Sequence, residues 1–492
     1  MVNMKFKKLL YSLLFFMLHT QLYAKQQTFK LATAIQSNMV VQQNKAFKIW
    51  GLAEANEQIS AQASWDNKKV TVTASVNGEW LLQLAVPKAK PGDFKPHYII
   101  IKHTKGEVKL DNILIGEVWL CSGQSNMEMT MLPAPPWHKG VLDYETEIPE
   151  ANYPNIRLFK VKRDTSSSKT IFVDAKWQVC SPETVGTFSG VAYYFGVDVF
   201  KKLNIPVGLV LSAYGGASCQ AFTAREVLEA DPQLKKKYLN KYLLQPDSVI
   251  LTNKPSLMYN KMIYPLINLS IKGILWYQGE SNSWDRGMYT KLCSAMLEGW
   301  RSDFKQGDLP FYFVQMTPFN WNKKSYPLNE YAFFREAQEA ILKVKNTGMA
   351  ITMDVGEPDD IHPRRKKEVG QRLAKIALHK SYGFKDINYL GPQYKACKIK
   401  EGKVLISFTK ESIAEGLRTK YGFSPKHFLI AGEDKKFYPA EARIQGDKVV
   451  VFAAEVKHPV AVRYAFQNYP VTNFQNKSNL PAVPFRTDNW NE

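Results

Sequence analysis

The sequence has few cysteines, no membrane-spanning run and no cofactor motif. Only five of its 492 residues are cysteines, and none forms a C-x-x-C pair, which argues against a disulfide-stapled scaffold, a redox motif and a zinc site. Beyond the first 24 residues, no apolar stretch approaches the roughly 20 residues of a membrane-spanning helix. Glycine-rich phosphate loops and clustered metal ligands are missing as well. We therefore expect a globular protein with no metal and no cofactor.

An excess of positive charge is spread along the chain. Lysine and arginine number 65 against 45 aspartates and glutamates, a formal charge of +20, and the longest basic run covers only residues 364–367. Dispersed lysine is typical of a solvated surface, and no nucleic-acid-binding motif accompanies it. We expect no nucleic-acid partner.

The N-terminus has the pattern of a secretory signal peptide over residues 1–24. Lys5, Lys7 and Lys8 precede an apolar run that is too short to span a membrane, and Ala24 supplies a small residue for cleavage. We expect a periplasmic or secreted protein with no membrane contact after cleavage of the signal. An uncleaved anchor is the alternative.

Turn signals divide the rest of the chain into a β part, an α/β part and a second β part. Residues 25–111 contain short β-type runs, and Asn77-Gly78 between two of them predicts a hairpin within a small sandwich-like module. Residues 391–492 again contain short β runs with glycines between them, which predicts a second β module.

The middle of the chain, residues 112–390, is predicted to be α/β. Its apolar runs are typical of strands buried on both faces of a parallel sheet, and they cover residues 113–120, 205–211, 271–277, 311–316 and 349–353. Helical periodicity before the second run gives the order strand, helix, strand. A proline-containing segment at about residues 130–182 lacks strong periodicity, so we expect it to be an excursion from this core.

Polar or glycine-rich segments follow three of these strands, at the edge where a parallel sheet binds its ligands. They are Gly123-Gln124-Ser125-Asn126, Gly215-Gly216 and residues 278–282, and an acidic segment with His362 comes later. Acyl transfer to serine needs a base, an acceptor that orients the base, and donors for the oxyanion. This order of residues suits that chemistry, although the G-x-S-x-G elbow of common α/β-hydrolases is absent.

These segments resemble the sialate O-acetylesterase family of SGNH-type, GDSL-like serine hydrolases. The motifs that carry the resemblance are Gly123-Gln124-Ser125-Asn126-Met127-Glu128, Trp276-Tyr277-Gln278-Gly279-Glu280-Ser281-Asn282 and Asp360-Ile361-His362-Pro363. The resemblance runs nearly end to end. It implies an α/β fold with an SGNH-hydrolase-like, doubly wound parallel sheet as its core, flanked by N-terminal and C-terminal β modules.

The resemblance implies Ser125 as the nucleophile and His362 as the general base. The acid has two candidates, because the wider superfamily places it three residues before the histidine, at Asp359, and the sialate esterases place it two before, at Asp360. A Ser-His dyad, in which a main-chain carbonyl takes the place of the acid, is the third possibility.

Oxyanion donors are expected from the main-chain N–H groups of Ser125 and Gly216 and from one side chain of the third motif. That side chain is either Gln278 or Asn282, because a serine stands where the superfamily has its asparagine. Gln124 and Arg335 are candidates for substrate binding. A guanidinium suits the carboxylate of a sialic acid, while a structural ion pair is the alternative role for Arg335.

The predicted function is that of a serine carbohydrate esterase, a sialate O-acetylesterase, which removes O-acetyl groups from sialic acids through an acetyl-enzyme intermediate. A deacetylase of other acetylated glycans, such as xylan, is the nearest alternative, because the loops around an SGNH-type site choose the sugar. A carbohydrate-binding protein with a catalytically silent core is an alternative of a different class. The expected partner is an acetylated glycan.

Overall fold

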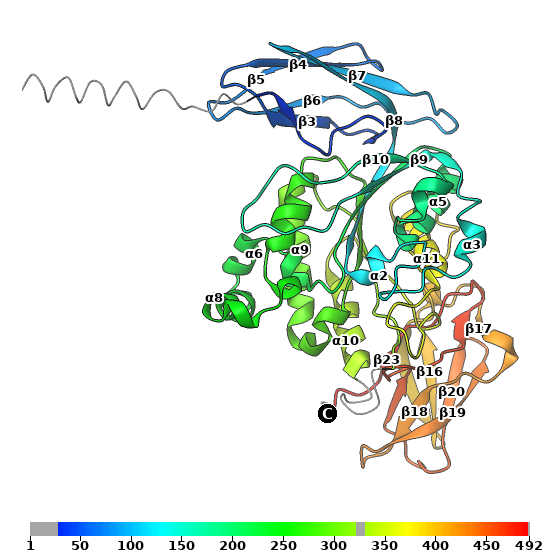
Figure 1. Cartoon of the computed structure of the whole chain (residues 1–492). Coiled ribbons are helices and arrows are strands. Elements are labelled where there is room, and N and C mark those ends of the chain that lie inside the picture. Colours follow the sequence, from blue (N-terminus) through cyan, green and yellow to red (C-terminus); the bar gives the residue numbers. More distant parts are fainter. Residues whose placement is uncertain (1–27, 321–329, 491–492) are drawn as a thin grey trace, which may run out of the picture.

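A computed structural model describes residues 28–320 and 330–490. A β module, a central α/β domain and a second β module follow one another in space as they do along the chain (Figure 1). The signal segment predicted at residues 1–24 lies outside the described residues. Within them, no helix combines the length and the apolar character that crossing a membrane requires.

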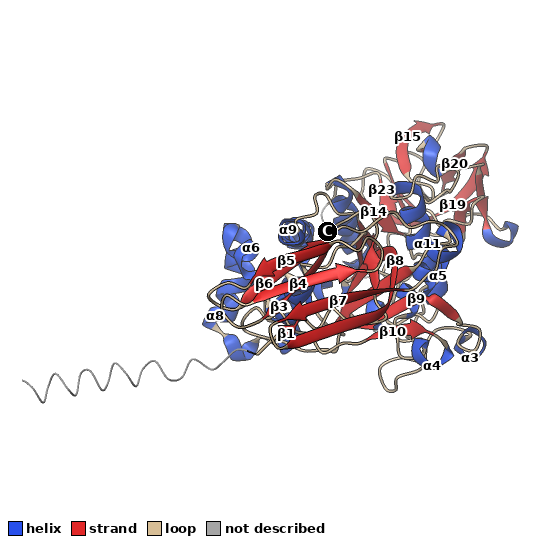
Figure 2. Cartoon of the chain, turned by 90° about the horizontal axis from the view of Figure 1, so that it is seen from above, coloured by secondary structure: helices blue, strands red, loops and turns tan. Residues whose placement is uncertain are grey.

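The N-terminal module consists of two layers of antiparallel strands (Figure 2). The strand bounds are β1 Lys30–Leu31, β2 Val40–Gln42, β3 Phe47–Leu52, β4 Gln58–Ala63, β5 Lys69–Thr73, β6 Glu79–Leu84 and β7 His97–His103. One layer has the order β1-β3-β6, and in the other β4 pairs with β5 and β7. Every second residue of β4 and β6 is buried, as expected for strands with one face on a core.

The turn at Asn77-Gly78 connects the two layers of this module. The N–H of Gly78 donates to the carbonyl of Ser75 at 2.9 Å, so the chain does reverse there. However, β5 pairs with β4 and β6 pairs with β3. The predicted hairpin is therefore wrong, because a local turn signal does not specify which strands pair across it.

One long strand, β8 (Gly106–Gly123), joins the N-terminal module to the central sheet. Its first part pairs antiparallel with β7, and its last part pairs parallel with two central strands, β11 (Val207–Ala213) and β12 (Gly273–Tyr277). The predicted boundary after residue 111 thus falls within a continuous strand.

The central sheet has the order β10-β9-β11-β8-β12-β13-β14. The remaining bounds are β9 Tyr153–Lys160, β10 Trp177–Cys180, β13 Phe311–Val314 and β14 Thr347–Ala350. Strands β9, β11, β8, β12, β13 and β14 pair parallel, and β10 pairs antiparallel with β9 at the edge. Strands β11, β12, β13 and β14 are buried along their whole length. This confirms the five predicted strands, although β14 begins two residues before the predicted run.

Strand β9 corrects the prediction for residues 130–182. The segment expected to be an excursion contributes β9 to the central sheet, where it pairs parallel with β11. Ile156 and Leu158 are buried in the core there. Pro154 and Asn155 near the start of the strand interrupt the apolar pattern, which is why no strand was predicted there.

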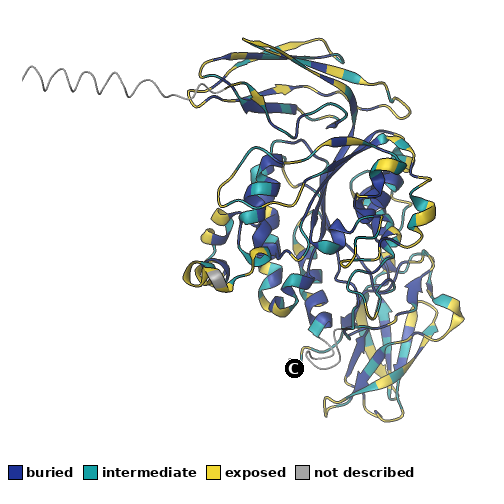
Figure 3. Cartoon of the chain, viewed as in Figure 1, coloured by how far each residue is buried: buried dark blue, intermediate teal, exposed yellow. Residues whose placement is uncertain are grey.

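Helices cover both faces of the central sheet (Figures 1 and 3). The helix bounds are α2 Ser125–Glu128, α3 Tyr144–Glu147, α4 Pro182–Val185, α5 Gly190–Leu203, α6 Arg225–Ala230, α7 Pro232–Leu234, α8 Lys241–Leu244, α9 Arg286–Phe304, α10 Glu330–Glu339 and α11 Lys366–Lys380. Helices α5 and α11 pack together on one face, and α9 and α10 lie on the other. Along β12, Trp276 belongs to one core cluster and Tyr277 to the other. The mixed α/β architecture is therefore confirmed.

The C-terminal module is an antiparallel β structure. Its bounds are β15 Tyr394–Lys400, β16 Lys403–Phe408, β17 Leu417–Thr419, β18 Phe428–Ala431, β19 Phe437–Gln445, β20 Lys448–Phe452, β21 Ala461–Tyr464, β22 Phe474–Asn476 and β23 Phe485–Arg486. The main sheet has the order β15-β16-β20-β19-β18-β21-β23, and β17 pairs with β22.

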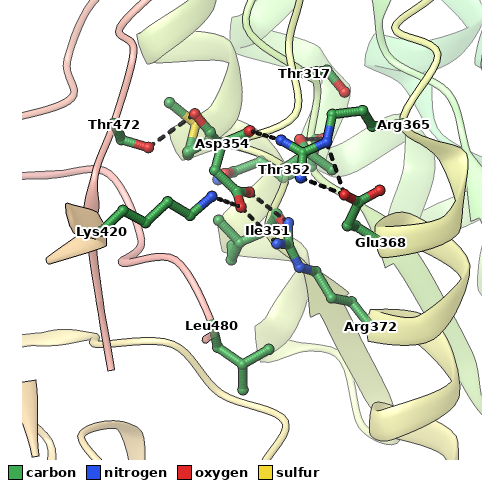
Figure 4. Close-up of polar contacts among 12 residues, drawn as sticks. Thr317, Ile351, Thr352, Asp354, Arg365, Glu368, Arg372, Lys420, Thr472 and Leu480 are labelled. Carbon is green, nitrogen blue, oxygen red and sulfur yellow. Dashed lines mark hydrogen bonds and ion pairs between the residues drawn. The ribbon is translucent and has the colours of Figure 1, made fainter. Parts of the chain in front are cut away.

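A buried ion cluster fastens this module to the central domain (Figure 4). Arg372 of α11 donates to both oxygens of Asp354 at 2.7 and 2.8 Å, and Lys420 of the C-terminal module donates to the same carboxylate at 3.0 Å. Beside it, the hydroxyl of Thr472 donates to the main-chain carbonyl of Met353 at 2.9 Å.

Candidate active site

One open cavity lies at the carboxyl ends of three central strands. Its volume is about 870 Å³. Ser125 follows β8, Gly216 follows β11 and Ser281 follows β12, and all three line the cavity together with His362 from the loop between β14 and α11. The structure therefore brings together the serine, the glycine turn and the histidine that the sequence predicts for one site.

Ser125 sits at a tight junction between β8 and α2. Gly123 has φ 137°, and a Cβ there would lie 2.1 Å from the carbonyl oxygen of Tyr277, so only glycine fits. The N–H of Gln124 donates to that same carbonyl at 3.0 Å. The end of β8 is thereby fixed against β12, and half-buried Ser125 is held at the cavity wall.

His362 is an uncharged imidazole at physiological pH. Burial and the nearby charge of Lys366 lower its pKa to about 4, against the opposing influence of Asp360 and a hydrogen bond to the main chain of Trp137. A general base must be unprotonated to accept the proton of a serine hydroxyl. The histidine is therefore in the form that the predicted role requires.

The two candidate acids differ in their relation to the histidine. Asp359 is exposed, and no described hydrogen bond or ion pair joins it to His362. Asp360 lies closer, but its Oδ1 accepts from the main-chain N–H of His362 at 2.8 Å and is 3.8 Å from Nδ1 of the ring. That separation is beyond hydrogen-bond reach, so neither aspartate orients the ring in this geometry, which favours the dyad.

Gln278 and Asn282 are buried away from the cavity, with 1% and 0% of their surface exposed. Gln278 Nε2 donates to Asn282 Oδ1 at 2.8 Å and to the carbonyl of Ala217 at 3.2 Å, and Asn282 Nδ2 donates to Gln220 Oε1 at 3.1 Å. Their amides tie the loop after β12 to the loop after β11. The geometry therefore does not support either side chain as the third oxyanion donor.

The Gly215-Gly216 turn is held by a carboxylate from the nucleophile motif. Glu128 Oε2 accepts from the N–H of Gly215 at 2.8 Å, and Arg163 donates to both oxygens of Glu128 at 2.5 and 2.7 Å. Ser281 donates its hydroxyl proton to the carbonyl of Gly216 at 2.8 Å. These contacts fix the two peptides on either side of the Gly216 N–H, the predicted oxyanion donor, and Gly216 is exposed at the cavity.

Gln124 lines the cavity, in agreement with its predicted place at the substrate. Its Oε1 accepts from the N–H groups of Gly279 at 3.4 Å and Ser281 at 3.2 Å. With the oxygen oriented toward those donors, the Nε2 group is directed away from them. No described hydrogen bond uses the Nε2 group.

Arg335 lies outside the cavity, with 1% of its surface exposed. Its guanidinium donates to three main-chain carbonyls, those of Met316 at 2.9 Å, Gln467 at 2.8 Å and Asn468 at 2.9 Å. The predicted contact with substrate does not fit this position, and no described carboxylate pairs with it. The side chain instead joins α10 to the C-terminal module.

Several cavity residues carried no sequence signal. Lys160, Lys162 and Arg163 make one side of the cavity basic, and Trp137, with 71% of its surface exposed, stands beside them with His138. The basic residues come from β9 and the loop after it, a segment without recognisable motifs. Only the position of β9 in the sheet, beside β11, could have located them.

The α/β fold and a cavity that joins a serine to an uncharged histidine are those of a carboxylic ester hydrolase, and comparison with known proteins agrees. Residues 115–379 match the family model described as carbohydrate esterase, sialic acid-specific acetylesterase. The chain belongs to this family.

Related proteins match almost the whole chain. Sialate O-acetylesterase of Homo sapiens is 28% identical over 500 residues, covering 93% of this chain and 92% of that protein, and the Mus musculus protein is 27% identical over 521 residues, covering 93% and 94%. The crystal structure of a carbohydrate acetylesterase from Xanthomonas citri has a TM-score of 0.82 and 32% identity, and the match covers 94% of this chain and 100% of that one.

Proposed function

We propose that this protein is an exported serine esterase that removes O-acetyl groups from sialic acids, built on an SGNH-type, doubly wound core. The observation that carries the proposal is the shared cavity of Ser125, His362 and Gly216. The sialate O-acetylesterases among its relatives support the substrate class. The signal pattern of residues 1–24 supports export to the periplasm or the medium.

The first half of the reaction forms an acetyl-enzyme. Ser125 Oγ bonds to the acetyl carbonyl carbon while His362 takes the hydroxyl proton. The bond between that carbon and the sugar oxygen then breaks, and His362 returns its proton to the departing sugar hydroxyl. In the second half, His362 takes a proton from water as the water oxygen bonds to the acetyl carbon. The bond between Ser125 Oγ and that carbon then breaks, His362 returns its proton to Oγ, and acetate leaves.

Three donors are suited to stabilise the oxyanion of both tetrahedral intermediates. They are the main-chain N–H groups of Ser125 and Gly216 and the Nε2 group of Gln124, which all belong to residues at the cavity wall. Fixed donors at such a site contribute roughly 10² to 10³ in rate each. Gln124 therefore takes the place that the sequence assigned to Gln278 or Asn282.

The basic side of the cavity supports an acidic sugar as substrate. Lys160, Lys162 and Arg163 line it, with Arg163 paired to Glu128 and Lys162 in an exposed ion pair with Asp174, so Lys160 is the cation without a described ion-pair partner. A sialic acid carries a carboxylate that these groups attract. A second candidate, an esterase of other acetylated glycans, is favoured by the Xanthomonas citri structure, which is described only as a carbohydrate acetylesterase.

Acetate release from matched substrates tests the proposal. The purified protein is given 9-O-acetylated sialic acid, its carboxyl methyl ester, and acetylated xylan, with Ser125→Ala as the control. We expect kcat/KM to be highest for the free acid and to vanish in the variant. Preference for xylan would move the substrate to the second candidate, and release by the folded Ser125→Ala protein would refute the mechanism.

A further inference from the structure

A lysine is buried directly behind the candidate catalytic residues. Lys366 is the first residue of α11, and none of its surface is exposed. Removing an ammonium group from water is costly, and a positive charge at the N-terminus of a helix is disfavoured by the helix dipole. A residue placed against both effects needs a compensating role.

The ammonium binds a single described side-chain oxygen. Lys366 Nζ donates to Asn126 Oδ1 at 2.6 Å. Asn126, which has 0% exposure, uses its Nδ2 group to donate to Glu280 Oε1 at 2.6 Å and to the carbonyl of Ile361 at 3.0 Å. One amide thus connects three parts of the chain, which are its own turn after Ser125, the loop after β12, and the segment from Ile361 to Lys366.

Each of these segments carries a part of the candidate site. Asn126 directly follows Ser125, Ile361 directly precedes His362, and Glu280 lies in the loop after β12 that lines the cavity. An ammonium can only donate hydrogen bonds. Lys366 therefore orients the Asn126 amide, with the oxygen toward itself and the Nδ2 group toward its two acceptors.

The charge of Lys366 also acts on the histidine. Burial lowers the pKa of Lys366 to about 7, opposed by Glu280, Asp360 and Glu357. The ammonium is therefore charged at acidic pH, where an imidazole ordinarily takes up its proton.

Besides Lys366, two titratable side chains and one main-chain group influence the protonation of the His362 ring. Asp360 favours its protonation, His138 opposes it, and the main chain of Trp137 accepts its hydrogen bond. Among these charged groups, Lys366 has the largest influence on the ring.

We propose that Lys366 is a positioning residue for the esterase reaction, which holds the Asn126 amide so that the loops of Ser125 and His362 keep their spacing. The inference rests on the proposed function. It assigns a role to a residue outside the nucleophile, the base and the oxyanion donors.

Replacement by a side chain of similar length without charge tests this role. Lys366→Met is expected to lower kcat/KM at least tenfold, as loss of a supporting contact does at other sites. The acid limb of its pH profile is expected to move up by about one pH unit, because the imidazole loses a neighbouring positive charge. Lys367→Met, the neighbouring exposed lysine paired with Glu147, is the matched control and is expected to match the unmodified protein.

A double-mutant cycle tests the connection through Asn126. Asn126→Ala alone is expected to lower kcat/KM by a similar factor, and the double variant is expected to lose no more than the worse single variant. Wild-type rates, an unmoved acid limb in Lys366→Met, or additive losses would overturn the proposal. If Lys366→Met does not fold, the same test is made with Lys366→Gln, whose acid limb in the pH profile of kcat/KM is expected to move up in the same way.

The Ser125→Ala protein separates this inference from the proposed function. If Ser125→Ala abolishes acetate release while Lys366→Met does not alter the rate or the acid limb, only the role of Lys366 fails. If folded Ser125→Ala retains activity, the proposed function fails and the role of Lys366 fails with it.

Discussion

Asp360 binds His362 through the main chain and not through the ring. Its Oδ1 accepts from the N–H of His362 at 2.8 Å and lies 3.8 Å from the imidazole Nδ1. The carboxylate thus shapes the loop that presents the histidine, and the main chain of Trp137 is the hydrogen-bond partner of the ring.

This relationship predicts unequal and modest effects of the two aspartates. Asp359→Asn is expected to leave kcat/KM within about twofold, because the side chain is exposed. Asp360→Asn is expected to lower it about tenfold by loosening the loop, whereas loss of a triad acid costs about 10⁴. Steady-state kinetics of both variants measure these losses. A loss of kcat/KM near 10⁴ in either variant would identify the replaced aspartate as the acid that orients His362.

The activity is expected to persist in mildly acidic solution. Because burial and Lys366 lower the pKa of His362 to about 4, the base stays unprotonated above that pH, and kcat/KM is lost only as the pH falls through about 4. The measurement is kcat/KM from pH 3.5 to 8, with circular dichroism at each pH to confirm folding. A midpoint near the ordinary histidine value of about 6.5 would contradict it.

Glu128→Gln is expected to lower kcat by roughly 10² to 10³, the effect of losing an oxyanion donor. The substituted amide keeps only one acceptor oxygen, and its NH2 group then faces an N–H of Arg163 or Gly215 where the carboxylate had its second oxygen. We expect this clash of donors to shift the turn that presents the Gly216 N–H. Kinetics with a thermal melt check this prediction.

The matched control for Glu128→Gln is Glu226→Gln. Glu226 forms an exposed ion pair with Lys169, and we expect its loss to change nothing. Equal kcat values in the two variants would show that the Glu128 carboxylate does not position the turn.

Asp354→Asn is expected to destabilise the protein by about 3 kcal/mol, because it leaves Arg372 and Lys420 without their buried partner. Burial alone would raise the pKa of Asp354, but these two cations outweigh it and hold the pKa well below its usual range. The stabilisation is therefore complete above the unfolded-state pKa of about 3.9 and is lost as the pH falls toward the lower folded-state value.

Chemical unfolding at pH 7 and pH 3 measures this effect. Glu441→Gln, at an exposed pair with Arg443, is the control, and we expect it to change stability by less than about 1 kcal/mol. An Asp354→Asn protein as stable as the control at pH 7 would contradict the prediction.

The sequence predicted the parts of the fold that depend on local pattern. Continuous apolar runs located β8, β11, β12 and β13, because strands buried on both faces lack polar alternation. Since the carboxyl ends of parallel strands meet at one edge, the polar residues after them converge, and Ser125, Gly216 and His362 do line one cavity.

The predictions failed where a side chain's role depends on distant partners. Arg335 has a suitable chemistry for substrate, but its acceptors include the carbonyl of Gln467, 132 residues away. Gln278 and Asn282 stand at the right point in the motif, yet they bind each other and the loop after β11. Lys366 lies in the basic run of residues 364–367, which we expected at the solvated surface, although it is the buried residue of that run.

The continuity of β8 has a structural consequence. From Gly106 to Gly123 it is one strand of 18 residues, and β2 of the first module also pairs with it along residues 114–116. The strand is irregular at Asn112, where φ is 57° and the register with β7 shifts, but its pairing continues on both sides of that residue. The module and the strand that ends before Ser125 therefore share one continuous backbone. A truncation that removes the module would leave the first part of β8 without β2 and β7, while the part directly before Ser125 keeps its pairing with β11 and β12. The module thus shares a sheet with the strand that carries the nucleophile.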